Sequence, residues 1–419
     1  MAPAADEKGW REDFRLDHRA AGDFQSAARF LHQREAGTVS FDFSAENLDR
    51  EFPVRKNLVY FNHAAVAPLP RRVADAITAH VENTRDRGAA DWRLWYATID
   101  STRQKAARFL GAHASEIAFL PSTSWALNVV ARSFDWRSGD NVVGDDIEFP
   151  ANFYPWKLLE KRGVAYRLAK SREGRVTVDD IAEKVDARTR IVAVSWVAFH
   201  NGCVYPIEEI GELCRERGIL FVVDAIQGLG ALPLDVSETA IDVLAADAHK
   251  WLLGQEACTI FYVAERARER LPPLFGGWWN MRAEESESGF LDHRMDFHVS
   301  ARRYEPGTLP TAQIAGLGAA IELLEELEPE TVRSRILETN EALRRGLCER
   351  GWKIASPEPL ASGILAAIPP GGDPKRIAKT LEQRGIIVAP REGAVRFSPH
   401  AYNEAAEAGK ILKALDELR

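Results

Sequence analysis

The stretch GILFVVDAIQGLGALPLDVSETAIDVLAADAHKWLLG, from Gly218 to Gly254, decides how this chain folds and where its chemistry lies. Its first part, Ile219 to Val223, is a continuous apolar run rich in β-branched residues, which predicts a strand buried on both faces of a parallel sheet. Asp224 follows where that strand ends, and open α/β sheets bind ligands beyond the carboxyl ends of their strands. A buried carboxylate there requires a cationic partner, such as a protonated pyridine nitrogen.

Lys250 follows a second, mostly apolar segment that begins at Asp242, and Trp251 comes directly after it. Lysine is rarely buried, and apolar surroundings lower the pKa of its ammonium group, which yields the neutral amine that attacks an aldehyde. An isolated lysine in such a setting is more often a snorkelling side chain at a strand end. Paired with Asp224, Lys250 indicates a Schiff-base enzyme.

The two motifs Asp224-Ala225-Ile226-Gln227 and His249-Lys250-Trp251 together resemble a known family. They look like the fold-type I pyridoxal-phosphate (PLP) enzymes of the class V aminotransferase family, which includes cysteine desulfurases, kynureninases and isopenicillin-N-epimerase-like proteins. The similarity runs from about Tyr60 to the C-terminus. It implies an α/β fold with a large, doubly wound, mostly parallel sheet and a small C-terminal α/β domain.

The resemblance also implies a role for each polar residue of the two motifs. Lys250 would carry the Schiff base with the cofactor, and Asp224 would pair with the pyridinium nitrogen. Gln227 would bond the phenolic oxygen of PLP. His249 would help to hold the phosphate, which makes Lys250, Asp224 and His249 the candidate catalytic residues.

A second landmark lies where the apolar run ending at Leu120 meets a predicted helix that begins near Trp125. The free backbone donors and the dipole of a helix N-terminus form an anion site. Thr123 and Ser124 match the hydroxyls that bind phosphate in the family. The simpler interpretation of two such residues is ordinary N-capping.

Two further segments resemble family landmarks around the cofactor. Phe149, in the run from Glu148 to Trp156, is the candidate for stacking on the cofactor ring, because Pro150 stands where desulfurases place a histidine. A buried core phenylalanine explains a lone Phe149 equally well. Thr308 ends a Glu-x-Gly-Thr turn that, in the family's dimers, reaches the partner subunit's phosphate, so the resemblance implies a homodimer with shared active sites.

Arg396 and His200 are the candidate substrate-binding residues. Arg396 lies in a β-like run and matches the clamp for the substrate carboxylate, a role that suits the planar, bidentate guanidinium group. An arginine in a strand is otherwise usually a solvated edge charge. His200 is either a substrate-facing acid or base, or a hydrogen-bonded structural histidine.

Departures from the family's pattern reduce the number of reactions that the chain is expected to catalyse. Desulfurases carry a cysteine on a loop before the carboxylate-binding arginine, and the segment from Gly351 to Arg396 contains none. Phe199 stands where desulfurases have an asparagine, and Asp247 stands where they usually have a phosphate-binding serine, so the charge of Asp247 must be turned away or compensated. A persulfide-forming desulfurase is disfavoured. Transamination, C–S cleavage by β-elimination and epimerisation remain open, because they share the same first steps.

The composition of the chain excludes several classes of protein. The chain has 419 residues and a net charge of -8, which argues against a broad nucleic-acid surface. Its four cysteines, Cys203, Cys214, Cys258 and Cys348, form neither a disulfide framework nor a zinc pattern, and no close histidine pair suggests a metal. No apolar run reaches the length of a membrane span. These features agree with a cytoplasmic enzyme, and the resemblance implies that its substrate is a small amino acid.

Three segments are expected along the chain: an N-terminal arm over residues 1–56, a large PLP-binding domain over 57–310 and a small domain over 311–419. Within the arm, the charged stretch from Arg11 to Arg34 is either a surface helix or a partner-binding helix. Trp278 and Trp279 lie on a loop that lines either the substrate pocket or the dimer interface.

Two other functions fit parts of the sequence. A nicotinamide dehydrogenase would need the glycine fingerprint that Gly228 and Gly230 begin, but Pro233 occupies the third glycine position. A non-catalytic protein with the PLP-enzyme fold would bind the cofactor without turnover.

Overall fold

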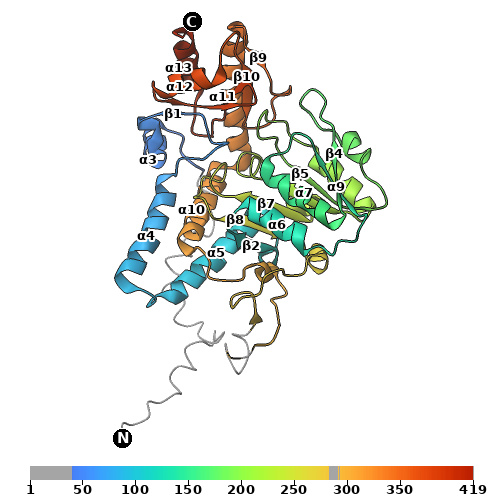
Figure 1. Ribbon diagram of the computed structural model, residues 1–419. Helices are drawn as coiled ribbons and strands as arrows, with labels where there is room; N and C mark the ends of the chain where they lie inside the picture. Colours follow the sequence, from blue (N-terminus) through green and yellow to red (C-terminus); the bar gives the residue numbers. More distant parts are fainter. Residues whose placement is uncertain (1–39, 283–290, 292, 419) are drawn as a thin grey trace.

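The computed structural model describes residues 40–282, 291 and 293–418, and its centre is a seven-stranded sheet (Figure 1). The strand order is β2 (Ile117–Leu120), β8 (Thr259–Val263), β7 (Val243–Asp247), β6 (Leu220–Asp224), β5 (Thr189–Ser195), β3 (Asn141–Asp145) and β4 (Ala165–Ala169). Only β8 runs antiparallel to its neighbours. The predicted α/β fold with a mostly parallel sheet is confirmed, and the apolar run before Asp224 is the fully buried strand β6.

Helices cover this sheet because its strands are apolar on both faces. The long helix α10 (Thr311–Leu327) packs against both α4 (Arg71–Arg87) and α5 (Trp92–Leu110). Figure 1 shows this group apart from α6 (Thr123–Ser133), α7 (Tyr154–Lys157) and α9 (Ile207–Glu216). The short helix α8 (Val178–Ala182) contacts α9.

A second, smaller hydrophobic core lies in the C-terminal part of the chain. Its antiparallel sheet has the order β12 (Ala389–Arg391), β13 (Ala394–Phe397), β10 (Leu365–Ile368) and β9 (Lys353–Ile354). The helices there are α11 (Pro329–Glu349), α12 (Pro374–Glu382) and α13 (Ala405–Asp416). An upstream strand, β1 (Val59–Tyr60), pairs in parallel with β11 (Ile386–Ile387), so a segment that precedes the large sheet lies beside the small one (Figure 1).

The predicted segment boundaries stay a prediction. Of the N-terminal arm, residues 1–39 lie outside the described residues, and with them the stretch from Arg11 to Arg34. The remainder contains α3 (Ala45–Glu51), and it packs on the main core through buried Phe41 and Leu48. Among the described residues, no helix combines the length and the apolarity needed to span a membrane.

The turn that contains Glu305 is fixed by a buried ion pair. Both carboxylate oxygens of Glu305 accept from the Arg103 guanidinium, at 2.8 and 3.1 Å, and one of them also accepts from the backbone N–H of Phe119 at 2.7 Å. The two side chains are 0% and 6% exposed. The pair therefore ties this turn to α5 and β2, next to the helix that begins at Thr123.

We expect Glu305→Ala to lower the free energy of unfolding by about 3–5 kcal/mol, because it leaves the Arg103 charge buried without its partner. Denaturant unfolding followed by circular dichroism measures this. Glu82→Ala, which removes a carboxylate from an exposed ion pair with Arg85, is the matched control and should leave the unfolding midpoint nearly unchanged. Equal effects of the two substitutions would contradict the structural role of Glu305.

Candidate active site

A cavity of about 310 Å³ brings together most of the residues that the sequence singles out. It opens at the carboxyl ends of β6 and β7, where parallel sheets bind ligands. The predicted residues that line it are Thr123, Ser124, Phe149, Asp224, Gln227, His249, Lys250 and Arg396. The other lining residues are Ala64, Ala65, Ser122, Ala151, Phe199, Ile226, Asp247 and Arg391.

Lys250 and Asp224 are both buried in this cavity, at 8% and 2% exposure. Burial lowers the pKa of Lys250 to about 8, although the negative charge of Asp224 opposes the shift. Burial likewise raises the pKa of Asp224 to about 6, against the hydrogen bond that its Oδ1 accepts from the Ile226 N–H at 3.0 Å. At neutral pH Asp224 is therefore mostly a carboxylate, and Lys250 supplies a larger share of neutral amine than an exposed lysine does.

The N-terminus of α6 forms one end of the cavity. Ser122 caps the helix, because its hydroxyl accepts from the Trp125 N–H at 3.1 Å, so the predicted N-cap lies one residue before Thr123. Thr123 and Ser124 are thereby left to face the cavity. The Thr123 hydroxyl accepts from the Asp247 N–H at 3.1 Å, which ties the helix to the end of β7 and leaves the hydroxyl proton for a ligand.

The charge of Asp247 is partly compensated inside the protein. Its Oδ1 accepts from the Ala248 N–H at 2.8 Å and from the Cys258 N–H at 3.4 Å. Its Oδ2 lies 3.4 Å from Nδ1 of His249, without hydrogen-bond geometry. The acid at this position thus faces an imidazole, while the remaining cavity wall at that end carries hydroxyl groups and a helix N-terminus.

Phe149 and Gln227 line the same cavity as Lys250. The Lys250 amine is 5.6 Å from the centre of the Phe149 ring, and that ring contacts Phe199 edge-on at 5.1 Å. Phe149 is 40% exposed, which excludes the interpretation as a core residue. The Gln227 amide accepts from the Trp251 indole and donates to the Ala64 carbonyl, so one N–H of the amide remains for a ligand.

Arg396 is buried at 1% exposure in the wall of the cavity. Its Nη1 donates to the Phe199 carbonyl at 2.6 Å, whereas its Nε and Nη2 have no hydrogen-bond partner among the described residues. Burial lowers the pKa of this guanidinium to about 9. A desolvated cation with one open edge is suited to bind a carboxylate.

Other predicted residues do not line this cavity. Thr308 is exposed, and His200 is half-buried beside Phe199, where burial lowers its pKa. Trp279 is in the interior, and its indole donates to Glu305 at 3.3 Å, whereas Trp278 is exposed. The pocket-lining interpretation of the two tryptophans is thus not supported for the described chain.

The sequence reasoning missed Arg391 as a cavity residue. Glu392 and Gly393 both have positive φ, at 43° and 76°, and form the tight turn between β12 and β13. Such a two-residue turn fixes the hairpin register. An apolar run, a Glu-Gly pair and a second run, read as a hairpin, would have placed Arg391 on the same face as Arg396.

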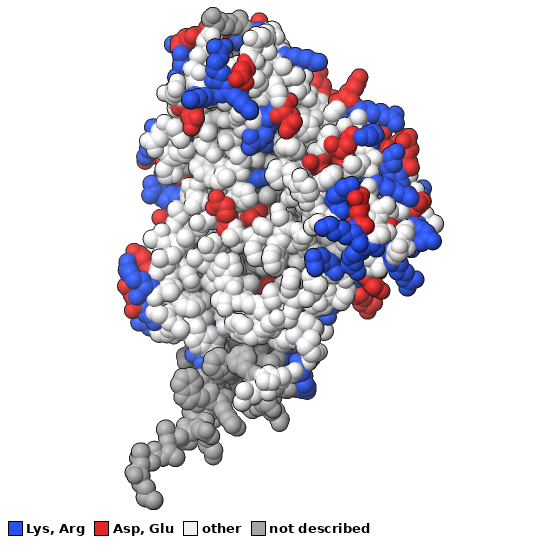
Figure 2. Space-filling view, in the orientation of Figure 1, with Lys and Arg blue, Asp and Glu red and all other residues white. Residues whose placement is uncertain are grey.

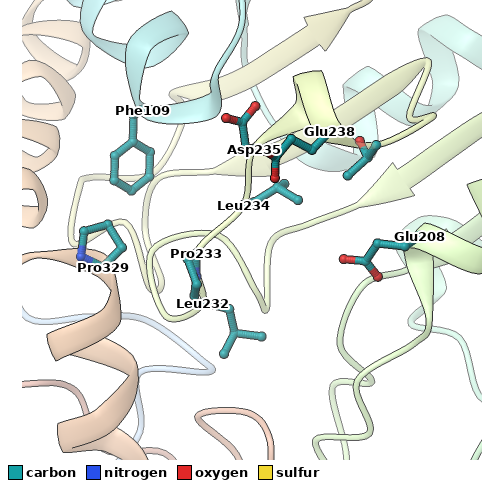
Figure 3. Close-up of a pocket in the computed structure, with 9 residues that line it drawn as sticks. Phe109, Glu208, Leu232, Pro233, Leu234, Asp235, Glu238 and Pro329 are labelled. Atoms are coloured by element: carbon teal, nitrogen blue, oxygen red, sulfur yellow. The ribbon is translucent and has the colours of Figure 1, made fainter.

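A second cavity, of about 430 Å³, lies elsewhere on the molecule. Figure 3 shows its apolar lining, which includes Phe109 and Pro329, and the carboxylates of Glu208, Asp235 and Glu238. It is the larger of the two cavities, but its lining contains no lysine, histidine or arginine. The chemistry of a Schiff-base enzyme therefore belongs to the cavity that contains Lys250.

The depressed pKa of Lys250 gives a pH prediction. The amine attacks an aldehyde only after it loses its proton, so the rate at which apoenzyme captures PLP should reach half its maximum near pH 8 and level off at higher pH. Asp224→Asn should move this midpoint to lower pH, because the carboxylate raises the pKa of Lys250. Absorbance of the bound cofactor after rapid mixing measures the rate, and a midpoint above pH 10 would contradict the burial argument.

Comparisons with known proteins show the family to which the chain is similar. Residues 59–407 match the family model described as aminotransferase class-V. A probable cysteine desulfurase of Methanothermobacter thermautotrophicus is 31% identical over 89% of this chain and 98% of its own length. The uncharacterized aminotransferase YcbU of Bacillus subtilis is 27% identical over 88% of this chain and 95% of its own.

Solved structures show the same fold. A cysteine desulfurase from Thermococcus onnurineus superposes with a TM-score of 0.82 at 25% identity, over 90% of this chain and 99% of that one. The cystine C-S lyase C-DES, in complex with cysteine persulfide, gives a TM-score of 0.82 at 24% identity, over 87% and 98% of the two chains. The chain belongs to the aminotransferase class V family.

Proposed function

We propose that this chain is a PLP-dependent enzyme that acts at Cα of an α-amino acid or amino-acid conjugate, with Lys250 as the residue that binds the cofactor covalently. The observation that carries the proposal is the single cavity in which buried Lys250 and buried Asp224 meet a helix N-terminus and the buried Arg396. A structural lysine would not need these three neighbours.

The residues present fit the cofactor. The hydroxyls of Thr123 and Ser124 and the N-terminus of α6 suit a phosphate group. His249 lines the same cavity, and its imidazole is a further candidate to hold the phosphate. Asp224 offers a carboxylate for a pyridinium nitrogen, and the remaining Gln227 N–H suits a phenolic oxygen.

Lys250, Asp224 and Arg396 would each have a separate role in the reaction. When bound, PLP supplies an electron sink for the electrons of a broken bond at Cα. Lys250 would hold or move a proton at Cα as general base and acid. The Asp224 carboxylate would keep the ring nitrogen protonated, and Arg396 would hold the substrate through its carboxylate.

The cysteines argue against a persulfide-forming desulfurase, although several relatives carry that name. Cys203, Cys214 and Cys258 are buried and Cys348 is exposed, and none of the four lines the cavity. Burial raises the pKa of each of the three interior thiols, which disfavours the nucleophilic thiolate. Sulfur transfer to an enzyme cysteine therefore has no acceptor in this site.

A panel of amino acids tests the proposal and resolves the reaction type. Purified enzyme with added PLP is incubated with each amino acid, and the products are read in parallel as keto acid, as ammonia or sulfide, and as loss of optical activity. Product from at least one amino acid supports an enzyme. Bound cofactor without any turnover across the panel would favour the non-catalytic alternative.

We also infer a homodimer with shared active sites. The exposed side chains of Trp125, Phe275 and Trp278 are large and apolar, and the rings of Trp125 and Phe275 stack at 5.4 Å. Trp125 is next to cavity residue Ser124, and Thr308 is exposed as a residue that reaches a partner must be. In Figure 2 the middle of the molecule carries few charges. Sedimentation equilibrium that reports only monomer would contradict this inference.

The location we propose is the cytoplasm. All four cysteines are free, which is the ordinary state of thiols in a reducing compartment. Fractionation of cells that express a tagged form of the chain would test this.

A further inference from the structure

Two arginines lie on the same face of the β12–β13 hairpin. Ala389 pairs with Arg396 across the two antiparallel strands, and Arg391 lies two residues from Ala389 along β12. Paired residues point to one side of a sheet, and so do residues two apart in a strand. Arg391 and Arg396 therefore point to the same side, and both line the cavity that contains Lys250.

The unpaired N–H groups of Arg396 can bind one carboxylate. Its Nη1 is engaged by the Phe199 carbonyl, and its remaining edge, formed by Nε and Nη2, is buried without a hydrogen-bond partner among the described residues. That edge presents two parallel N–H groups, which match the two oxygens of a single carboxylate. The α-carboxylate of an amino acid satisfies it.

Arg391 has no assigned partner when Arg396 binds the α-carboxylate. It is exposed, it donates to the carbonyl of its neighbour Pro390 at 2.9 Å, and it forms no ion pair within the described ranges. Its positive charge lowers the pKa of both Arg396 and Lys250, so three cations share one cavity and repel one another. A second anionic group on the ligand would offset this repulsion.

The other charges of the cavity are already assigned by the proposed function. Asp224 faces the pyridinium nitrogen, and Asp247 accepts backbone hydrogen bonds beside His249. The cofactor phosphate belongs to the helix N-terminus at Thr123. Neither Asp224 nor Asp247 is thus available to neutralise Arg391.

We propose that the substrate is an amino acid with a second acidic group, in which Arg396 binds the α-carboxylate and Arg391 binds the distal acid. This inference rests on the proposed function, because it places the substrate amino group at Lys250. It narrows the substrates from amino acids in general to dicarboxylic or otherwise dianionic amino acids.

The test uses the full-length enzyme with PLP and follows the cofactor absorbance as amino acids are titrated. Three matched pairs are compared: L-aspartate with L-asparagine, L-glutamate with L-glutamine, and O-phospho-L-serine with L-serine. The variants are Arg391→Gln and, as the control, Arg376→Gln, which removes an exposed arginine from α12 in the same part of the chain.

The wild-type enzyme and the Arg376→Gln control should bind the acidic member of at least one pair on the order of tenfold more tightly, as one charge-assisted contact provides. Arg391→Gln should remove this preference and change the affinity for the neutral member by no more than about twofold.

Two results overturn the inference. One is a wild-type enzyme with no acidic preference in any pair, including no response to any amino acid of the panel. The other is an Arg391→Gln variant that weakens both members of a pair equally, because Arg391 would then act on the α-carboxylate. A protein that never acquires the cofactor absorbance refutes the proposed function instead, so the two failures are distinguishable.

Discussion

Lys250→Ala is expected to abolish the absorbance of covalently bound PLP and to lower turnover by at least about 10,000-fold. The substitution removes the amine that anchors the cofactor and the base that moves the Cα proton, and general acid–base catalysis alone contributes up to about 10,000-fold. Absorbance spectra of the protein reconstituted with PLP, and turnover of the best amino acid of the panel, measure the two effects.

The matched control is Lys375→Ala, which removes an exposed lysine at the start of α12. It should leave both the spectrum and the turnover at wild-type values. If Lys250→Ala kept the wild-type spectrum, another lysine would hold the cofactor and the assignment of Lys250 would be wrong.

Arg396→Ala is expected to reduce kcat/KM by roughly 10- to 150-fold, because a hydrogen bond to a charged group is worth about 1.5–3 kcal/mol. The loss should appear for amino acids and not for amines of the same length that lack the α-carboxylate. Arg396→Lys should recover little of it, since an ammonium group cannot bind the carboxylate with two parallel N–H groups.

Retention of the cofactor absorbance by the Arg396 variants controls for folding, which matters because Arg396 is buried. An equal loss of activity toward amino acids and toward amines would contradict the role of Arg396 as the carboxylate clamp.

The sequence predicted the centre of the site because that part depends on local order. An apolar run followed by a polar residue places Asp224 at the end of β6, and the same pattern places Lys250 just beyond the end of β7. Hydroxyl residues at a helix start place Thr123 at the N-terminus of α6. Strand ends and helix starts are fixed by neighbouring residues, so one sequence suffices to find them.

The rest of the cavity depends on long-range pairing. Ala64 and Ala65 line the cavity, and the Ala64 carbonyl accepts from Gln227. They follow β1, which pairs with the distant β11 in a two-stranded sheet, and alanine gives no chemical signal of such a position. Arg391 lines the cavity because of the register in which β12 pairs with β13. Thr308 lies off the cavity of its own subunit, and its predicted role requires a second copy of the chain.

The groups that compensate the charge of Asp247 could be identified only from the folded structure. The sequence indicates that the charge of Asp247 needs a partner. The backbone N–H groups of Ala248 and Cys258 provide part of that compensation. Backbone donors are the same in every sequence, so they give no sequence signal. Only the pairing of β7 with β8 brings the Cys258 N–H to this carboxylate.

The most direct test of the central claim is to reduce the PLP-loaded enzyme with borohydride and to map the modified peptide by mass spectrometry. Reduction converts a Schiff base into a stable amine, so the lysine that holds the cofactor keeps a pyridoxyl adduct. The structure predicts one adduct, on the peptide that contains His249, Lys250 and Trp251. An adduct on a different lysine, or no adduct on a protein that contains PLP, would contradict it.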